Sequence, residues 1–418
     1  MLMIEPIGSL LVKKSLLKDK ETIQITGSKS VSNRLLILRA LFGNIIIGNL
    51  SNSQDSQVME KALSSTEEVV DIHHAGTAMR FLTSYFAIQE GKTTILTGSE
   101  RMKQRPIQYL VDALRSLGAE IEYLGTDGFP PLKIVGKKLH QSKVQIPANV
   151  SSQFLTSLLL IGGKLEQGLE LELIGDITSR SYLEMTLKMI SEAHIKASFI
   201  GNKITVYPYE KIGTKSYVNS FEVESDWSSA SYFYSLSAIG RKDIFLKSFK
   251  THSMQGDSAL KQIYWDFFGV NTITDEAEYT ISLCPDDHYQ RPEKIVLDMN
   301  DCPDIAQTVC VTATALHMPF ELTGLGTLKV KETDRLVALQ NELIKIGCQT
   351  EITEDSIKSI AFTEPYNDIS IKTYNDHRMA MSFAPYSLIK ELTIEDAEVV
   401  EKSYPDFWSD FYKVTEQI

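Results

Sequence analysis

Six stretches of the chain share one pattern of polar and apolar positions. In each, a few small, hydroxyl-bearing or charged residues precede about three turns of mostly apolar helix. The first stretch is residues 26–40, and the others begin at His74, Ala148, Ser225, Asn300 and Asn375. The later copies recur about every 75 residues. The pattern predicts six helices that start with polar groups and bury their apolar continuation.

A second, amphipathic helix follows the first in several repeats, starting near residues 102, 179, 254 and 330. Each ends at a glycine or another small residue and leads into a strand of alternating pattern. Short β-branched stretches lie between the helices, at residues 93–96, 143–146, 204–207 and 244–246. The predicted repeat is therefore a βαβαββ unit, used six times.

Three units in each of two similar lobes would suit a chain of 418 residues. We expect an α/β fold in which residues 1–20 and 225–418 form the first lobe and residues 21–224 form the second. No Pro/Gly/Ser linker separates the lobes, so short ordered segments should join them. A cleft between lobes is a preferred ligand site.

Composition narrows the class of protein. The formal net charge of −12 argues against a nucleic-acid partner. The N-terminus lacks a signal-peptide pattern, and no apolar run approaches the roughly 20 residues that span a bilayer. The four cysteines lie far apart, which disfavours a disulfide framework or a zinc site. We expect a cytoplasmic, reduced enzyme with no membrane partner.

Residues 26–40 place Lys29 and Arg34 at a helix start. The first turn of a helix already presents unpaired N–H groups and a partial positive charge. A bound phosphate or carboxylate would resolve this conflict. The alternative is that both are solvated surface side chains, paired with Asp55.

Other cations recur at the same position of the repeat, the helix entrance. They are Arg105, Lys331, Arg335, Arg378 and Lys402. If they converge, they could bind two anionic groups at once.

Asp304 and Glu332 lie among these cations and suit acid–base chemistry. For Asp304 the alternative is a helix N-cap, as it also is for the hydroxyl and amide donors Ser151, Ser152 and Gln153. A repeat protein that merely reuses one helix remains the alternative for the whole pattern.

Motifs of other enzyme classes are absent. The chain has no GxGxxG after a strand, no GxxxxGK[ST], no HExxH and no GxSxG. His73 and His74 have no third ligand at metal spacing. We therefore expect two anionic substrates, no cofactor and no metal.

The polar helix starts and their flanks resemble the EPSP synthase family of 3-phosphoshikimate 1-carboxyvinyltransferases. The matching segments, in the order of the family, are GSKSVSNR, AGTAMRFL, MKQRPI, SSQFLTSLLL, DWSSASYF, PDIAQT, KVKETDRL and NDHRMAMSF. They extend over nearly the whole chain.

The resemblance implies an inside-out α/β barrel of two lobes, with three βαβαββ units in each and the active site in the interlobe cleft. It also implies transfer of the carboxyvinyl group of phosphoenolpyruvate to the 5-hydroxyl of shikimate 3-phosphate. Phosphate leaves by addition and elimination through a tetrahedral intermediate, as a step of aromatic amino-acid biosynthesis. The implied protein is a monomer whose only partners are these two small molecules.

The resemblance also implies a role for each matching residue. The shikimate 3-phosphate ligands would be Lys29, Ser30, Arg34, Ser151, Ser152, Gln153, Ser179, Tyr182, Asp304 and Lys331. The phosphoenolpyruvate ligands would be Lys29, Gly76, Arg105, Gln153, Arg335, His377, Arg378 and Lys402. Asp304 is the candidate base for the 5-hydroxyl. Glu332 resembles the acid that protonates the methylene carbon, a role for which Lys29 competes.

The chain departs from the family pattern at His74, Phe81 and Trp227, and none of these departures removes a charged ligand. Glyphosate is expected to compete with phosphoenolpyruvate because Gly76 leaves room beside the pocket, although Phe81 could perturb it. Two alternatives remain. One is the related enzyme that acts on a UDP-amino sugar, which typically uses a loop cysteine that this chain lacks near Arg105. The other is a non-catalytic anion-binding repeat protein, which need not keep Lys29, Asp304 and Glu332 together.

Overall fold

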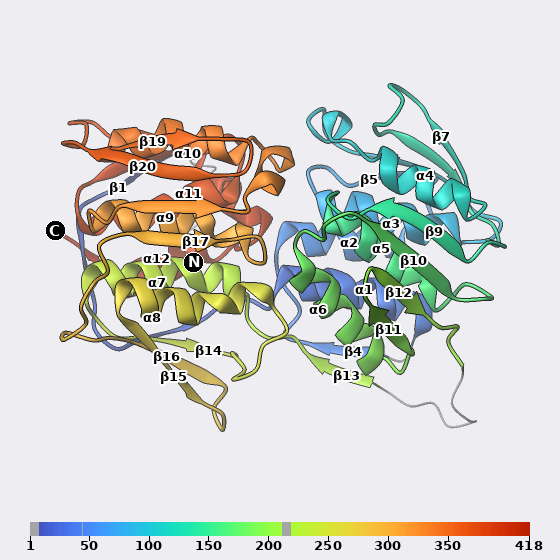
Figure 1. The fold of residues 1–418 in the computed structure, drawn as a ribbon, viewed down its shortest axis with the longest axis horizontal. Coiled ribbons are helices and arrows are strands. Elements are labelled where there is room, and N and C mark those ends of the chain that lie inside the picture. The colour runs from blue at the N-terminus through green and yellow to red at the C-terminus, as the bar shows by residue number, and fades with distance from the viewer. Residues whose placement is uncertain (1–7, 44, 211–218) are drawn as a thin grey trace. The chain divides into compact units, whose positions relative to one another are not determined.

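The computed structural model describes residues 8–43, 45–210 and 219–418, and these divide into two compact units (Figure 1). Unit 1 contains the described residues of 1–27 and 224–418, and unit 2 contains those of 28–223. Residues 21–27 thus belong to unit 1 and not to the second lobe, because β3 (Glu21–Gln24) pairs with β14 (Ile244–Lys247). The expectations for residues 1–7 and 211–218 lie outside the described residues.

Four sheets have one topology, in which two parallel strands are followed by an antiparallel hairpin. Unit 2 contains two of them. The strand order of one is β5 (Val69–Asp71), β6 (Thr93–Thr97), β8 (Leu132–Val135) and β7 (Glu120–Tyr123). The strand order of the other is β9 (Lys143–Pro147), β10 (Leu169–Ile174), β12 (Lys203–Val206) and β11 (Ala197–Ile200). Unit 1 contains the other two. The strand order of one is β3, β14, β16 (Thr280–Pro285) and β15 (Val270–Asp275). The strand order of the other is β17 (Ile295–Asp298), β18 (Phe320–Thr323), β20 (Ile357–Phe362) and β19 (Cys348–Ile352). Three of these sheets are built from consecutive elements and confirm the predicted βαβαββ unit there, whereas the fourth takes its first strand, β3, from the N-terminal segment.

The other two repeats build smaller sheets within the described residues. In unit 1, β21 (Ser370–Ile371) and β22 (Leu392–Glu395) are parallel, and β1 (Ser9–Val12) completes the sheet. A separate pair joins β2 (Ser15–Leu17) to β23 (Thr415–Gln417). In unit 2, β4 (Ile45–Gly48) pairs with β13 (Asn219–Glu222). The N-terminal strands therefore contribute to sheets whose other strands come from much later in the chain.

The six predicted apolar helices are all present. They are α1 (Lys29–Phe42), α3 (Gly76–Ala87) and α5 (Ser152–Gly162) in unit 2, and α7 (Trp227–Gly240), α9 (Ala306–Ala315) and α11 (His377–Phe383) in unit 1. In unit 2 the three helices contact one another, and in unit 1 α9 contacts both α7 and α11. All ten residues of α9 are buried, as expected for a helix packed on every side. The apolar half of the repeat thus forms the centre of each unit.

The amphipathic helices are α2 (Gln54–Ser64), α4 (Gln108–Ser116), α6 (Arg180–Glu192), α8 (Leu260–Phe268) and α10 (Arg335–Leu343), with α12 (Phe407–Val414) near the C-terminus. Local sequence explains several of their ends. The Asp334 side chain caps α10 by accepting from the N–H groups of Leu336 and Val337, and Gly269 ends α8 with a φ of 63°. None of the described helices has both the length and the apolar content that crossing a bilayer requires.

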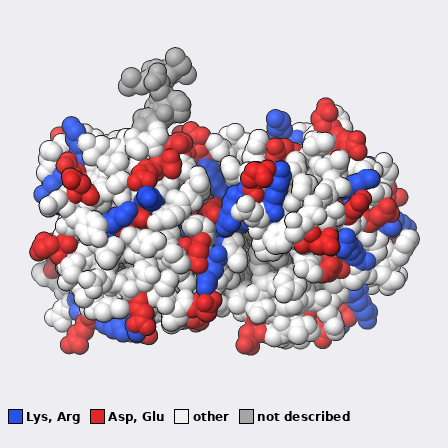
Figure 2. All heavy atoms as spheres, turned by 90° about the horizontal axis from the view of Figure 1, so that it is seen from above, with Lys and Arg blue, Asp and Glu red and all other residues white. Residues whose placement is uncertain are grey.

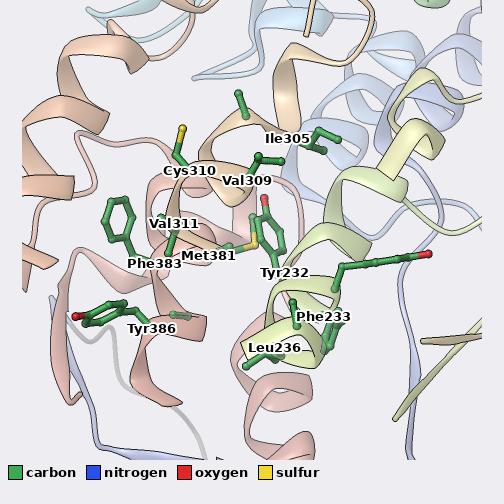
Figure 3. Packing of buried hydrophobic residues seen from close by; sticks show 14 of the residues in the cluster. Tyr232, Phe233, Leu236, Ile305, Val309, Cys310, Val311, Met381, Phe383 and Tyr386 are labelled. Carbon is green, nitrogen blue, oxygen red and sulfur yellow. The ribbon is translucent and has the colours of Figure 1, made fainter. Parts of the chain in front are cut away.

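The core of unit 1 joins side chains from its three central helices (Figure 3). Tyr232 of α7, Val309 of α9 and Met381 of α11 lie in one buried cluster. Small hydroxyl side chains cross the same contact. Ser231 and Thr308 lie 2.9 Å apart, and Thr308 and Ser382 lie 3.1 Å apart. Small residues let the helices approach closely, and Arg378 at the start of α11 contacts Ser228 at the start of α7 and Asp304 just before α9.

Candidate active site

The predicted site residues of unit 1 lie at the starts and ends of short helices. Asp304 is in the 3-10 helix η3 (Pro303–Ile305), directly before α9, and Arg378 is in the first turn of α11. Lys331 and Glu332 follow η4 (Gly326–Val330), and Lys402 ends η7 (Ala397–Lys402). The structure brings Asp304, Lys331, Glu332, Arg335, Arg378 and Lys402 together, and we call these six residues the unit 1 group.

Arg335 is the centre of the unit 1 group. Its side chain is 2% exposed and contacts three carboxylates. Nε lies 2.6 Å from Asp376, and the terminal nitrogens lie 2.9 Å from Asp304 and 3.0 Å from Glu332. Burial would lower the pKa of Arg335, but the three carboxylates together raise it above its ordinary value. The guanidinium is therefore a permanent charge.

Asp304 accepts contacts from three cations. Its Oδ1 lies 2.9 Å from Arg335 and 3.3 Å from Lys331 Nζ, and its Oδ2 lies 3.1 Å from Arg378. Burial would raise the pKa of Asp304, but Arg378, Lys331 and Arg335 hold it well below its usual range. Asp304 is thus ionised at neutral pH, and it is a weak base for as long as these cations surround it.

Glu332 links two cations in the same way. Its Oε1 lies 2.6 Å from Lys402 Nζ, and its Oε2 lies 3.0 Å from Arg335. The Lys402 and Glu332 side chains are 10% and 14% exposed, so this ion pair is largely withdrawn from water. The expected acid therefore lies between a lysine and an arginine.

Arg378 and His377 start α11. Arg378 donates to the Asp304 carbonyl at 2.9 Å and to Ser228 Oγ at 3.2 Å, in addition to the Asp304 carboxylate. The side chain of His377 is 2% exposed, and its Nδ1 lies 3.7 Å from Asp376 Oδ1. His377 is thus packed beside the unit 1 group, next to Arg378 in the chain.

Lys29 occupies the first position of α1 in unit 2. No side chain caps this helix, and its first turn has no acidic residue. The Oγ of Ser28, the residue before α1, is buried and has no hydrogen-bond partner among the described residues. Lys29 Nζ lies 3.4 Å from Asp55 of α2, the partner that the alternative interpretation named. The helix start nevertheless combines unpaired N–H groups with a cation, which suits an anion.

Arg34 is buried and not a solvated surface side chain, so that alternative is wrong for this residue. Its Nε donates to Thr186 Oγ1 at 2.8 Å, and NH1 donates to the Ser30 carbonyl at 2.8 Å. Its guanidinium carbon lies 5.5 Å from the Phe81 ring centroid and 5.9 Å from that of Tyr182. Burial lowers the pKa of Arg34 to about 10, and Tyr182 opposes this shift. Arg34 has no ion pair within the described part of the chain.

Arg105 and Gly76 are in contact at the start of α3. A Cβ added to Gly76 would lie 2.5 Å from an Arg105 terminal nitrogen. Arg105 is 7% exposed, and its buried Nε has no hydrogen-bond partner among the described residues. Gly76 thus leaves the space that the guanidinium occupies.

The remaining residues predicted for unit 2 lie at the starts of α5 and α6. The Ser151 side chain caps α5 by accepting from the N–H of Gln153 at 3.4 Å, and Ser152 is the first residue of α5. Gln153 Nε2 donates to Thr77 Oγ1 at 3.3 Å. Ser179 precedes α6 with a φ of 53°, and Tyr182 lies in the first turn of that helix.

Sequence reasoning missed two carboxylates of the site. Asp376 is fully buried, caps α11 by accepting from the Arg378 N–H at 2.9 Å, and pairs with Arg335. An aspartate directly before His377 and Arg378 has the pattern of an N-cap, which could have revealed it. Asp257 accepts a hydrogen bond from Ser228, and no local sequence pattern indicates this contact. Among the described residues, no group of three or more histidine, cysteine or acidic side chains could hold a metal ion.

Both signs of charge are interspersed on the face of the molecule that Figure 2 shows. Outside the unit 1 group, most ion pairs lie at exposed positions, such as Arg39 with Glu60 at 2.6 Å. Surface pairs of this kind contribute little to stability. The unit 1 group differs because its charges are buried and have several partners each.

The unit 1 group thus places four cations around two carboxylates, close to helix starts of a pattern that the sequence repeats six times. The family model described as EPSP synthase (3-phosphoshikimate 1-carboxyvinyltransferase) matches residues 60–411. The chain belongs to the EPSP synthase family.

Curated members of the family are similar along nearly their whole length. The chain is 44% identical over 402 residues to the 3-phosphoshikimate 1-carboxyvinyltransferase of Bacteroides fragilis. The aligned region covers 94% of this chain and 95% of the relative. It is 36% identical over 430 residues to the enzyme of that name from Haemophilus influenzae, with 94% and 96% covered.

Solved structures share the fold. EPSP synthase from Acinetobacter baumannii matches with a TM-score of 0.71 at 22% identity, and the match covers 98% of each chain. The enolpyruvyl transferase NikO from Streptomyces tendae matches with a TM-score of 0.71 at 11% identity, also over 98% of each chain. The two-lobed α/β fold expected for the family is therefore confirmed.

Proposed function

We propose that this protein transfers the carboxyvinyl group of phosphoenolpyruvate to the 5-hydroxyl of shikimate 3-phosphate and releases phosphate. The observation that carries the proposal is the unit 1 group, which holds four cations around Asp304 and Glu332. Such a group suits a substrate with both a carboxylate and a phosphate. The relatives that carry the name of this activity support it.

Arg335, Arg378 and Lys402 bind phosphoenolpyruvate in this proposal, together with Lys29, Gly76, Arg105, Gln153 and His377. Arginine suits a carboxylate because its fork makes two parallel hydrogen bonds. In the present structure, the two terminal nitrogens of Arg378 donate to the backbone carbonyl and to the carboxylate of Asp304. Lys402 supplies a point charge for the phosphate. In the present structure, its Nζ lies 2.6 Å from Glu332 Oε1.

Shikimate 3-phosphate binds to the unit 2 residues Ser30, Arg34, Ser151, Ser152, Ser179 and Tyr182, with Lys29, Gln153, Asp304 and Lys331. The uncapped start of α1 receives the phosphate beside Lys29, because its backbone N–H groups and the lysine are both donors to an anion. Arg34 lies in the first two turns of the same helix, and its side chain donates hydrogen bonds to Thr186 and to the Ser30 carbonyl.

Asp304 is the proposed base. The 5-hydroxyl gives its proton to Asp304 while its oxygen bonds to C2 of phosphoenolpyruvate, and an acid protonates C3. Phosphate then leaves, and the conjugate base of that acid takes a proton back from C3, which restores the carboxyvinyl group. In the structure three cations make Asp304 a weak base. When Arg378 and Lys331 turn to the anionic substrates, Asp304 loses part of this stabilisation and its pKa rises toward the working range.

Glu332 is the proposed acid at C3, and Lys29 is the other candidate. The Glu332 carboxylate lies between Lys402 and Arg335, so in this proposal the bound substrate draws these cations away before Glu332 acts at C3. Lys29 has only Asp55 as an ion-pair partner among the described residues, at 3.4 Å.

Phosphate release with purified protein, phosphoenolpyruvate and shikimate 3-phosphate tests the function. Release should require both substrates and should match the carboxyvinyl product one to one. If a UDP-amino sugar replaces shikimate 3-phosphate as the better acceptor, the sugar-specific activity is correct instead. If neither substrate binds and no phosphate appears, the protein is not this transferase.

Lys29→Met tests the unit 2 contribution. We expect a folded protein whose turnover falls at least about 100-fold, because the charge at the phosphate and at the reacting carbon is lost. Lys61→Met is the matched control, since Lys61 is an exposed lysine of α2. Near-normal turnover of Lys29→Met would show that its contact with Asp55 is only structural.

We propose a cytoplasmic, monomeric enzyme. The support is the chemistry of the thiols, because Cys284, Cys302, Cys310 and Cys348 are all free. Light scattering at micromolar concentration tests the monomer, and a mass of twice 47.0 kDa would contradict it.

A further inference from the structure

A buried carboxylate lies behind the unit 1 group and reaches it through one hydroxyl. Asp257 belongs to the 3-10 helix η2 (Gly256–Ala259) and is 5% exposed. Ser228 Oγ, in the first turn of α7, donates a hydrogen bond to Asp257 Oδ2. Ser228 Oγ also accepts a hydrogen bond from a terminal nitrogen of Arg378, at 3.2 Å. The same Arg378 nitrogen donates to Asp304 Oδ2 at 3.1 Å. Asp257, Ser228, Arg378 and Asp304 thus form one hydrogen-bonded chain.

The direction of these bonds determines how Ser228 meets Arg378. A hydroxyl has one proton to donate and two lone pairs that accept. Because the proton of Ser228 is used on Asp257, a lone pair faces the Arg378 guanidinium. Without Asp257, the hydroxyl could rotate and turn its proton toward the cation. Asp257 therefore fixes the rotation of a side chain that contacts a proposed substrate ligand.

Asp257 is costly for the fold. Its Oδ1 is buried and has no hydrogen-bond partner among the described residues. Asp257 also has no ion-pair partner within 4.0 Å in the part of the chain that the structure describes. A buried carboxylate that is only partly satisfied destabilises a protein, so its presence beside reactive groups points to a role in function.

The charged groups around Asp257 come from several elements. Asp304 of η3 and Asp226 before α7 are negative, Arg378 of α11 is positive, and the Cys302 thiol is also close enough to be affected. Burial raises the pKa of Asp257 to about 7, and Asp304 adds to the rise while Arg378 and Ser228 oppose it. Asp257 can therefore change its charge in the range where enzymes usually work.

We propose that Asp257 is a positioning residue of the transfer reaction, which acts through Ser228 to orient Arg378 for the anionic substrate. The proposal rests on the function proposed above. When Asp257 is neutral, Arg378 has one negative neighbour fewer and binds phosphoenolpyruvate more tightly. When Asp257 is ionised, it competes with the substrate for the charge of Arg378.

Steady-state kinetics of Asp257→Ala, Ser228→Ala and the double variant test the chain of contacts. Each single variant should lower kcat/KM for phosphoenolpyruvate at least tenfold, mainly through KM. The double variant should be no worse than either single variant, because both changes break the same link. Losses that multiply in the double variant, or a wild-type KM in Asp257→Ala, would overturn the proposal.

Asp257→Asn tests the charge while keeping an oxygen that can accept from Ser228. The ratio of its kcat/KM to that of the wild type should rise several-fold between pH 6 and pH 8, and this ratio cancels the titration of phosphoenolpyruvate itself. Asp266→Asn changes an exposed carboxylate of α8 and should show a flat ratio. A flat ratio for Asp257→Asn as well would contradict the role of the charge.

A measurement without substrate separates this proposal from the proposed function. In protein labelled with ¹⁵Nε-arginine, the Arg378 resonance is identified by its absence in Arg378→Lys. It should shift with pH between 6 and 8 in the wild type and stay constant in Asp257→Asn. Absence of turnover in the wild type would overturn the function alone, whereas an Arg378 resonance insensitive to Asp257 would overturn the link.

Discussion

At the scale of single residues, Arg335 shows how the candidate site is also part of the fold. Three carboxylates from three separate segments of the chain contact one guanidinium that is 2% exposed. Taking such charges out of water is expensive, and only their mutual contacts offset the cost. Removal of the guanidinium leaves the fully buried Asp376 without its closest cation.

Arg335→Met should destabilise the protein by about 3–5 kcal/mol, because it leaves buried carboxylates uncompensated. Urea unfolding followed by circular dichroism measures the change.

The matched control is Arg39→Met, which removes an ion pair of similar length whose side chains are 38% and 50% exposed. It should cost less than about 1 kcal/mol, because solvent screens exposed pairs. If the two variants lose equal stability, the buried contacts of Arg335 are not what stabilises this region.

At the scale of elements, the helix starts divide into two kinds. Ser151, Asp226, Asp334 and Asp376 cap α5, α7, α10 and α11 with their own side chains. The starts of α1 and α3, like those of α4, α6, α8 and α9, have no side-chain cap and no acidic residue in the first turn. Lys29 and Arg105 lie beside the starts of α1 and α3, so at these two starts a cation that the sequence predicted as a ligand joins the N–H groups that can bind an anion.

Gly76→Ala changes the start of α3 without adding charge. Its Cβ would lie 2.5 Å from Arg105, so the guanidinium must move. We expect KM for phosphoenolpyruvate to rise at least about tenfold, as loss of one charged contact costs of the order of 1.5–3 kcal/mol.

Gly125→Ala is the control for this change, since the nearest atom to its Cβ would be at an ordinary 3.7 Å. Its KM should match that of the wild type. An unchanged KM in Gly76→Ala would exclude Arg105 as a ligand of this substrate.

The contact between α7, α9 and α11 depends on hydroxyls as well as on apolar side chains. Thr308→Val keeps the shape of the side chain but removes the hydrogen bonds to Ser231 and Ser382. Leaving these buried hydroxyls with fewer partners should destabilise the protein by about 1–3 kcal/mol. Thermal unfolding measures the loss, and a variant as stable as the wild type would show that the hydroxyls find other partners.

At the scale of the whole molecule, stability should depend on pH through Asp257. Its pKa is raised by burial to about 7, so between its ordinary value and pH 7 the folded state binds more protons than the unfolded state. Stability therefore falls as pH rises through this window, and the loss is complete above pH 7. The ion pairs of Asp304 act in the opposite direction, because its depressed pKa stabilises the fold until pH falls to acidic values.

Asp257→Asn isolates this contribution. The variant should be more stable than the wild type at pH 8 by up to about 4 kcal/mol, since each unit of pKa is worth 1.36 kcal/mol. The difference should shrink toward zero near pH 4. Unfolding curves at pH 4, 6 and 8 provide the test, and a difference that does not vary with pH would contradict it.

Much of the fold follows from local pattern. The six polar-to-apolar helices, four of the amphipathic helices (α4, α6, α8 and α10) and the strands between them were predictable because helical and strand periodicities act over a few residues. The cations at the helix starts were predictable for the same reason, since every repeat places its helix entrance at the same point. Family membership also follows from the sequence, because its motifs occur in order along the chain.

Only the tertiary structure decided which distant segments meet. β3 pairs with β14 in register Glu21 to Ile244, which draws residues 21–27 into unit 1 and moves the expected boundary. Arg335 meets Asp304 and Asp376 across 31 and 41 positions of the chain, and Asp257 reaches Arg378 only through Ser228. Such contacts depend on how whole elements pack, so local periodicity carries no information about them. The sequence by itself thus determined the elements and their charges, and packing determined which charges became partners.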